Sequence, residues 1–209
     1  MKSKVIEVFT DGAASGNPGP GGWGAIIVFL GQQIQELGGF IDHTTNNRME
    51  LLAALECLKS LSHTKEPIFL YSDSQYLLNG MTKWLHSWKK NAWKTAENGA
   101  VANQDLWQAL DDEVSRRKKA SLGNVSWSYV PGHSGHWGNE RADEIAVSFS
   151  QKNPVELFSG DISQYSHYKN QSVPTQKNKS GPVVYLSYID GKLERHKTWS
   201  ECEARVKGR

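Results

Sequence analysis

Apolar and polar residues follow two periods along the first 150 residues, and these periods predict an alternation of strands and helices. Alternating or continuous apolar runs predict strands at residues 4–10, 22–30, 32–41, 67–72 and 124–130. Apolar residues at helical spacing predict helices at residues 46–61, from 74 onward, at 105–119 and at 138–149. This order of elements predicts an α/β fold, a five-stranded mixed sheet with helices packed on it.

The pattern changes near residue 151, where a polar stretch without periodicity predicts a linker. Apolar alternation resumes at residue 183, where the pair 190–191 (Asp-Gly) predicts a hairpin turn. Ser200 and Glu203 form a capping box that predicts a helix. We expect a folded domain at residues 1–150, a linker at residues 151–182 and a small α+β appendage at residues 183–209. The appendage is too short to form an independent hydrophobic core.

Composition narrows the class of protein. The chain has 209 residues, of which 38% are hydrophobic, enough for a packed core. Its net charge is only +2, so any binding of nucleic acid depends on local basic patches. Cys57 and Cys202 lie far apart, which disfavours a disulfide framework and fits a reducing compartment. Without an apolar leader or a run of about 20 apolar residues, we expect a cytoplasmic protein with no membrane contact.

Four acidic residues lie where an α/β protein could use them together. Asp11 and Asp73 follow predicted strands, near the edge where such sheets bind ligands, while Glu50 and Asp143 lie on predicted helices. Singly, each has an ordinary structural explanation, as a turn residue, a helix cap or a partner of the helix dipole. If they converge, each pair about 4 Å apart repels by roughly 4 kcal/mol at an effective dielectric of 20, so they need protons or cations.

Carboxylate oxygens favour hard cations, so a converged cluster would select Mg²⁺ or Mn²⁺. Two such ions support in-line displacement at phosphorus without a nucleophilic Ser or Cys. The glycine-rich stretch at residues 9–27 lacks the Gly-Lys-Ser/Thr ending of a P-loop, which disfavours a nucleotide site. His133 and His136 could be loop histidines or a zinc pair, but no further zinc ligands lie nearby.

Four stretches of the sequence resemble, in order, the signature blocks of the ribonuclease HI family. They are FTDGAASGNPGPGGWG, TTNNRMEL, YSDSQYLLNG and VPGHSGHWGNERADE, and the likeness covers residues 4–150. The resemblance implies a ribonuclease H-like fold with helices on both faces of the sheet. It also implies a monomer that cleaves the RNA strand of RNA–DNA hybrids with two Mg²⁺ ions, for which Mn²⁺ can substitute, leaving 5′-phosphate and 3′-hydroxyl ends.

The resemblance also implies roles for the acidic residues and for one histidine. Asp11 would bridge the two metal ions, Asp143 would favour the ion that carries the attacking water, and Glu50 and Asp73 would hold the other ion. His133 matches a histidine in a mobile loop that shuttles protons or helps the product leave. Integrases, resolvases and exonucleases on this fold share the acids but lack the TNNRME block, and a non-enzymatic hybrid-binding module would have lost at least one acid.

Substrate contacts can be expected on the same basis. The wide minor groove of a hybrid displays 2′-hydroxyls, which neutral amides such as Asn17, Asn47 and Gln75 could read. Thr45 and Asn46 match positions that hold phosphates.

The tract KWLHSWKKNAWKTA resembles the basic protrusion of the family. Lys89 and Lys90 would track the DNA phosphates and Trp84 would contact the DNA strand, whereas Trp88 and Trp93 are expected to be mainly structural. The alternative is an amphipathic helix whose tryptophans belong to the core. Because Ser87 and Asn91 depart from the family pattern, we expect a somewhat weaker hold on the hybrid.

The C-terminal stretch TWSECEARVKG resembles part of a hybrid-binding domain. If it binds, the linker would raise the local concentration of substrate at the catalytic domain. The alternative is a partly ordered tail.

Overall fold

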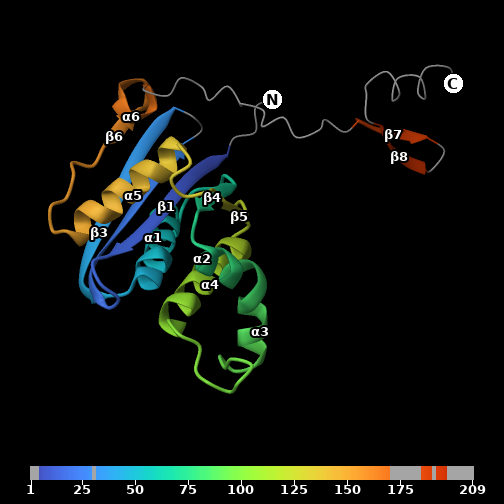
Figure 1. Ribbon diagram of the computed structural model, residues 1–209, viewed down its shortest axis with the longest axis horizontal. Coiled ribbons are helices and arrows are strands. Elements are labelled where there is room, and N and C mark those ends of the chain that lie inside the picture. Colours follow the sequence, from blue (N-terminus) through green and yellow to red (C-terminus); the bar gives the residue numbers. More distant parts are fainter. Residues whose placement is uncertain (1–4, 30–31, 170–184, 190–191, 197–209) are drawn as a thin grey trace. The chain divides into compact units, whose positions relative to one another are not determined.

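A computed structural model describes the chain at residues 5–29, 32–169, 185–189 and 192–196. The chain divides into two compact units, Met1–Gln171 and Ser172–Arg209 (Figure 1). In the described ranges, no helix has both the length and the apolar character that crossing a membrane requires.

A mixed sheet forms the centre of the first unit, and in the described part of the chain it has the strand order β5-β4-β1-β2-β3-β6. The strands are β1 (Ile6–Ala14), β2 (Gly19–Phe29), β3 (Gln33–Thr44), β4 (Ile68–Ser72), β5 (Val125–Tyr129) and β6 (Ser159–Asp161). Strands β1 to β3 are antiparallel neighbours, whereas β4 runs parallel to β1 and β5 parallel to β4. The mixed α/β sheet is confirmed, but the predicted count of five strands is wrong because β6 pairs antiparallel with β3 as a sixth.

The four predicted helical regions of the first unit form, whereas two short helical turns among the described residues lie in the stretch predicted as a linker. The helices are α1 (Asn46–Ser60), α2 (Gln75–Asn79), the π-helical η1 (Gly80–Trp84), α3 (Leu85–Lys90), α4 (Gln104–Lys119) and α5 (Trp137–Ser150), and the two turns are the 3₁₀ turn η2 (Ile162–Gln164) and α6 (Ser166–Lys169). Thr45 caps α1, since its side chain accepts a hydrogen bond from the Arg48 N–H at 3.4 Å.

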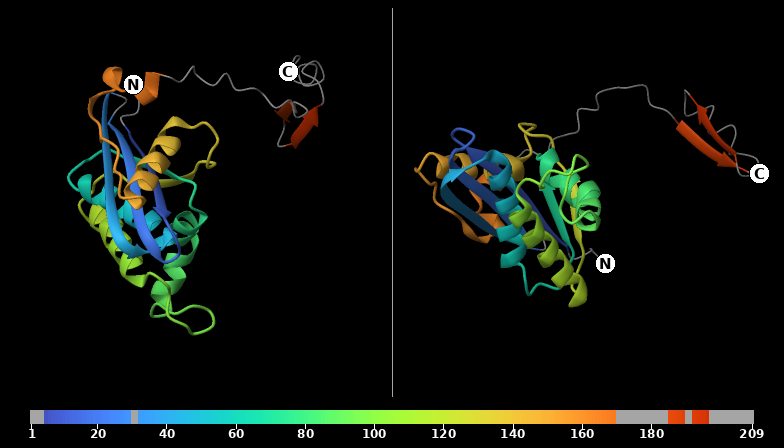
Figure 2. Two further views of the ribbon diagram at one scale, coloured as in Figure 1. Left: turned by 60° about the vertical axis from the view of Figure 1, so that its left-hand side comes forward. Right: turned by 90° about the horizontal axis from the view of Figure 1, so that it is seen from below.

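Helices cover both faces of the sheet (Figure 2). Adjacent strand residues point to opposite faces, so Val8 packs into the hydrophobic cluster with α1 and α4, whereas Phe9 packs into the cluster with α5. Gly24 of β2 lies directly against α5, where a β-carbon would collide with the Ala142 carbonyl. The absence of a side chain at Gly24 therefore allows α5 to pack closely against the sheet.

Part of the stretch predicted as a linker folds onto the sheet. Besides strand β6, it contributes Tyr165, whose side chain is fully buried in the cluster under α5. This packing surrounds a buried ion pair, in which Arg141 Nε and Nη2 of α5 donate to the two carboxylate oxygens of Glu36 at 2.8 and 2.9 Å. The tyrosine hydroxyl and the Phe158 N–H also donate to Glu36.

The Glu36 carboxylate should make the stability of the fold depend on pH in the acidic range. Burial alone would raise its pKa, but the hydrogen bonds from Arg141, Tyr165 and Phe158 outweigh burial and hold the pKa below its usual 4.5. A lowered pKa stabilises the fold above the unfolded value, and this stabilisation disappears as the pH falls through the folded value. Urea unfolding from pH 7 to pH 3 should therefore show a stability gap between wild type and Glu36→Gln that shrinks below about pH 4.5. A gap that stays constant would contradict this linkage.

The second unit contains a hairpin of β7 (Tyr185–Ile189) and β8 (Lys192–His196), paired antiparallel with Ile189 opposite Lys192. Its register agrees with the predicted turn at residues 190–191, although the turn itself and the predicted helix after Ser200 lie outside the described residues.

Candidate active site

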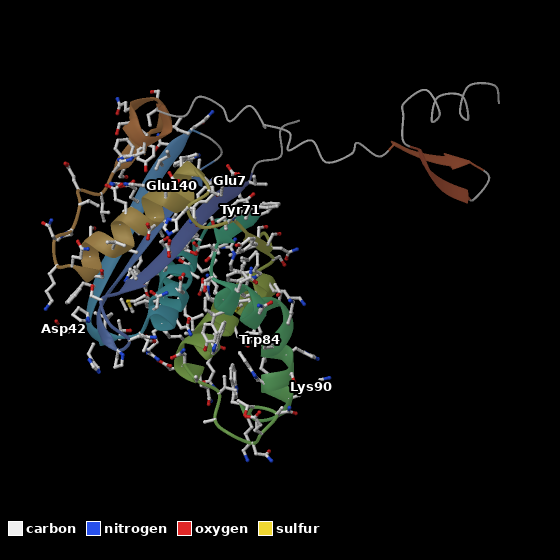
Figure 3. All side chains as sticks on the ribbon, viewed as in Figure 1. Glu7, Asp42, Tyr71, Trp84, Lys90 and Glu140 are labelled. Atoms are coloured by element: carbon white, nitrogen blue, oxygen red, sulfur yellow. The ribbon has the colours of Figure 1, made fainter. Side chains whose placement is uncertain are left out.

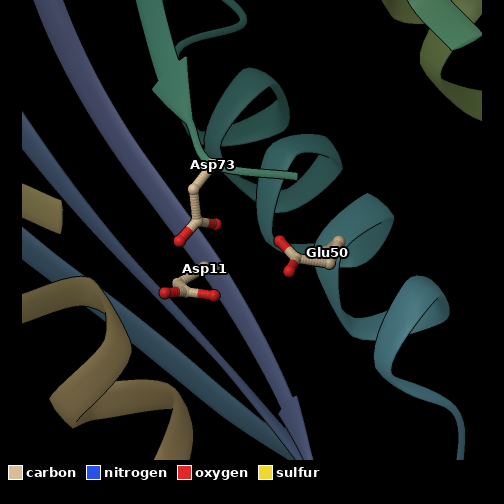
Figure 4. A group of neighbouring side chains, drawn as sticks. All are labelled: Asp11, Glu50 and Asp73. Atoms are coloured by element: carbon tan, nitrogen blue, oxygen red, sulfur yellow. The ribbon is translucent and has the colours of Figure 1, made fainter. Parts of the chain in front are cut away.

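Three carboxylates meet at one place beside the sheet. Asp11 comes from β1, Asp73 follows β4 directly, and Glu50 lies in the second turn of α1. One oxygen from each lies within 4.8 Å of the others, and Figure 4 shows the three side chains pointing toward one another. The sequence places Asp11 at the end of its strand, which is wrong: β1 continues to Ala14 because its ladder with β2 extends to Gly21.

Burial and mutual repulsion make this cluster reluctant to carry its full negative charge. Burial, followed by the charges of Asp73 and Asp143, raises the pKa of Asp11 to about 8, although the Gly12 N–H donates to its Oδ1 at 2.7 Å. Burial and the charges of Asp11, Asp73 and Asp143 also raise the pKa of Glu50 well above its usual value. Near neutral pH, the cluster therefore needs protons or cations to balance its charge.

The donor set fits hard divalent cations. Glu50 Oε2 is buried and has no hydrogen-bond partner among the described residues, so it is available to an ion. The oxygen atoms that this cluster offers as metal ligands belong to carboxylates, which suit Mg²⁺ and Mn²⁺ and not the softer metals.

Asp143 and His133 lie at the margin of this cluster. Asp143 is half-buried on α5 and is close enough to raise the pKa of both Asp11 and Glu50. Burial raises its own pKa, and the nearby imidazole of His133 opposes this rise. His133 is exposed in the loop before α5, with a positive φ of 49°, and the neighbouring Gly135 has a φ of 82°. The structure thus brings all five predicted catalytic residues to one region.

The structure adds Asn139 to the site, which the sequence analysis missed. Its side chain is buried on α5, and Nδ2 donates to Asp73 Oδ2 at a long 3.5 Å. Its Oδ1 has no partner within the described part of the chain. The signal was present, because Asn139 precedes Asp143 by four residues and therefore lies on the same face of α5.

The residues predicted to read the minor groove surround the cluster. Asn17, in the loop between β1 and β2, accepts the backbone N–H of Asn46 at 3.3 Å and so lies against the N-terminus of α1. Asn46 Nδ2 in turn reaches Glu50 Oε1 at 3.5 Å. Asn47 and Gln75 are exposed, at the starts of α1 and α2. One surface therefore presents these amides beside the carboxylates.

The predicted basic protrusion is an arm built from η1, α3 and the loop that follows. Trp84 and Lys90 project from it (Figure 3). Trp88 and Trp93 pack against the core cluster as predicted, while Trp84 is 36% exposed and contacts the Trp88 ring. Lys89 differs from its neighbour, because its Nζ forms an ion pair with Asp111 Oδ2 of α4 at 2.5 Å.

A polar network that the sequence analysis also missed ties α1 to α2 and to the start of α4. Arg48 makes a paired contact with Asp105 at 2.9 and 2.6 Å and reaches Asn103 Oδ1 at 3.4 Å. Asn103 Nδ2 and Trp107 Nε1 both donate to the hydroxyl of Tyr76, which neighbours Gln75. The network holds the start of α4 against the two elements that carry the exposed amides.

The fold and the acidic cluster define the class: an α/β protein with a candidate metal site beside the central strands β1 and β4 of a mixed sheet. The family model described as RNase H matches residues 3–151. The chain belongs to the ribonuclease H family and is an enzyme of that kind.

Relatives named Ribonuclease H agree with this assignment. The protein of Mesorhizobium japonicum is 57% identical over 146 residues, which are 69% of this chain and 77% of that protein. The protein of Cyanothece sp. is 46% identical over 75% of this chain and 96% of its own. Among solved structures, LC9-RNase H1, a type 1 RNase H with the type 2 active-site motif, superposes with a TM-score of 0.62 at 27% identity over 81% of each chain.

Proposed function

We propose that this enzyme hydrolyses the RNA strand of RNA–DNA hybrids with two divalent cations, Mg²⁺ or Mn²⁺, and leaves 5′-phosphate and 3′-hydroxyl ends. The observation that carries the proposal is the meeting of Asp11, Glu50 and Asp73, whose oxygens lie within 4.8 Å of one another. Membership of the ribonuclease H family supports the choice of substrate.

Asp11, Glu50, Asp73 and Asp143 would hold the two ions. When bound, the ions supply an activated water and stabilise the leaving oxygen of an in-line displacement. The chain itself holds the carboxylates in place: the Gly12 N–H fixes Asp11, and the Asn139 amide reaches Asp73. His133, exposed and beside Asp143, is placed to take up or release a proton and to move aside with its loop as product leaves.

Recognition of the hybrid would depend on its sugars and shape. Asn17, Asn47 and Gln75 offer neutral donors and acceptors to 2′-hydroxyls, which only the RNA strand carries. Thr45 and Asn46 at the N-terminus of α1 would bind a phosphate, where backbone N–H groups and the helix dipole favour anions. Trp84 and Lys90 on the arm would contact the DNA strand.

A panel of matched duplexes tests this proposal. One sequence is offered as RNA–DNA hybrid, double-stranded RNA and double-stranded DNA, in Mg²⁺, with wild type and Gln75→Ala. We expect cleavage of the hybrid alone, and a weaker cleavage by the variant, because one 2′-hydroxyl contact is lost. Cleavage of the DNA duplex would refute recognition through the 2′-hydroxyl.

The two lysines at the end of α3 should differ in their contribution to binding. Lys90 is exposed, whereas Lys89 is already paired with Asp111 and would have to exchange that partner for a phosphate. In salt titrations of hybrid affinity, Lys90→Ala should reduce the slope of log K against log salt by about 1. Lys89→Ala should change it less, and Asp111→Asn should tighten binding. A larger loss at Lys89 than at Lys90 would contradict this ranking.

Binding of the hybrid by the appendage at residues 183–209 stays a prediction. The monomeric state and the cytoplasmic location also stay predictions. Because residues up to Gln171 belong to the first unit, the test deletes residues 172–209 and leaves the packed segment intact. A binding appendage predicts that KM for the hybrid rises while kcat is unchanged. An unchanged KM would mean that the appendage is not a substrate arm.

A further inference from the structure

A short segment at residues 155–165, here called the β6 segment, lies outside the stretch that the family model matches. It nevertheless packs into the catalytic unit, beneath α5. We propose that Tyr165 of this segment, acting through Glu36 and Arg141, is a positioning residue that fixes how α5 lies on the sheet and thereby where Asp143 points. This inference rests on the proposed function, because it treats Asp143 as a metal ligand.

The Glu36 carboxylate joins three parts of the chain. Its oxygens accept hydrogen bonds from Arg141 of α5 at 2.8 and 2.9 Å, from the Phe158 N–H at 2.9 Å and from the Tyr165 hydroxyl. Arg141 Nη2 also donates to the Glu156 carbonyl at 2.9 Å. The β6 segment therefore supplies donors to the glutamate and an acceptor to the arginine. Without it, a buried charge pair would lose part of its hydrogen bonding.

The place of Arg141 on its helix explains why this pair matters for the site. An α-helix turns about 100° per residue, so Arg141 and Asp143 lie about 200° apart, on opposite sides of α5. Arg141 binds Glu36 on β3, while the charge of Asp143 acts on Asp11 of β1 from the other side of the helix. Rotation of α5 about its axis would move both residues at once. The bond to Glu36 therefore sets the direction of Asp143.

A second contact fixes the start of α5. The ring of Tyr165 lies edge-on to that of Trp137, the first residue of α5, with centroids 5.8 Å apart. Trp137 in turn lies 5.6 Å from Phe9, which precedes the Thr10–Asp11 pair on β1. His136 also packs on Phe9, with ring centroids 4.8 Å apart. The same tyrosine thus contacts α5 at the end that joins the loop carrying His133.

The test measures metal binding directly, in addition to activity. Tyr165→Ala should weaken Mn²⁺ binding in calorimetry by about tenfold, the loss typical when a residue that supports a metal ligand is removed. At a fixed, subsaturating metal concentration, kcat should fall while KM for the hybrid is unchanged, and excess Mn²⁺ should restore kcat. Tyr165→Phe, which keeps the ring against Trp137, should bind Mn²⁺ more tightly than Tyr165→Ala.

Leu110→Ala is the matched control, because it removes a fully buried side chain from the hydrophobic cluster on the other face of the sheet. It should lower the melting temperature but leave Mn²⁺ affinity unchanged. The proposal is overturned if Tyr165→Ala binds Mn²⁺ as tightly as Leu110→Ala does. If Tyr165→Ala does not fold, Tyr165→Phe and Glu36→Gln decide, and wild-type affinity in both overturns it. Failure of wild type to cleave the hybrid, or unchanged Mn²⁺ affinity in Asp143→Asn, would instead refute the proposed function.

Discussion

Asp11→Asn should abolish cleavage and, in metal-free solution, make the protein more stable. The substitution would remove a ligand of the proposed metal site, and losing several kcal/mol of transition-state stabilisation would slow the reaction about a thousandfold or more. The gain in stability has a separate cause. Asp11 is buried beside Asp73 and Asp143, and its pKa of about 8 means that its charge is unfavourable in the fold.

The sign of the pH dependence follows from that pKa. Above about pH 4 the unfolded chain releases the Asp11 proton, whereas the metal-free fold keeps it until about pH 8. Wild type therefore loses stability as the pH rises through this range, and Asn, which never ionises, does not. In EDTA at pH 8, Asp11→Asn should melt at least about 2–4 °C above wild type, the shift that about 1 kcal/mol produces in a domain of this size.

Asp42→Asn is the control for this pair of effects. Asp42 is also an aspartate of the same sheet, but it is exposed and paired with Lys152 at 2.8 Å. Its substitution should change neither cleavage nor melting temperature appreciably. If Asp11→Asn is stable and cleaves the hybrid as fast as wild type, the acidic cluster takes no part in the reaction.

The largest loss of stability should come from Arg141→Met. Arg141 and Glu36 are both buried, so removing the arginine leaves the glutamate charge without its partner, which typically costs about 3–5 kcal/mol. For a domain of this size the melting temperature should fall by about 10 °C. Thermal unfolding monitored by circular dichroism measures the effect.

Two comparisons separate this effect from simple loss of a surface charge. Lys152→Met breaks the exposed pair with Asp42 and should cost less than about 1 kcal/mol. Adding Glu36→Gln to Arg141→Met removes the stranded charge and should recover part of the loss. If the double variant is no more stable than Arg141→Met, the stranded charge is not the cause.

The sequence alone predicts the main elements well because their hydrophobic periods are long. The helix from Asn46 has apolar residues at helical spacing, and the strand before Asp73 is a short apolar run. Both form as expected. Strand β6 could not be predicted, since Ser159–Asp161 is too short to show a period. Its position depends on pairing with Gln33–Gln35 of β3, which lie far earlier in the chain.

The acidic cluster shows the same division between local and distant signals. Motif order identifies the four acids, but no local pattern reports that β1 continues past Asp11. Residues 11–14 pair with residues 21–24 of β2, and this extension appears only when the two strands are paired. The place of Asn139 beside the cluster could have been predicted from its helical spacing to Asp143. The pairing of Lys89 with Asp111 could not, because that contact joins two helices.

Cleavage followed separately on each strand shows whether the enzyme cuts RNA alone in a hybrid. A hybrid carries one fluorophore on its RNA strand and another on its DNA strand, and wild-type protein is added in Mg²⁺ and, separately, in EDTA. We expect that only the RNA strand is cut, that its products carry 5′-phosphate and 3′-hydroxyl ends, and that EDTA stops the reaction. Cutting of the DNA strand, or cleavage that persists in EDTA, would contradict this expectation.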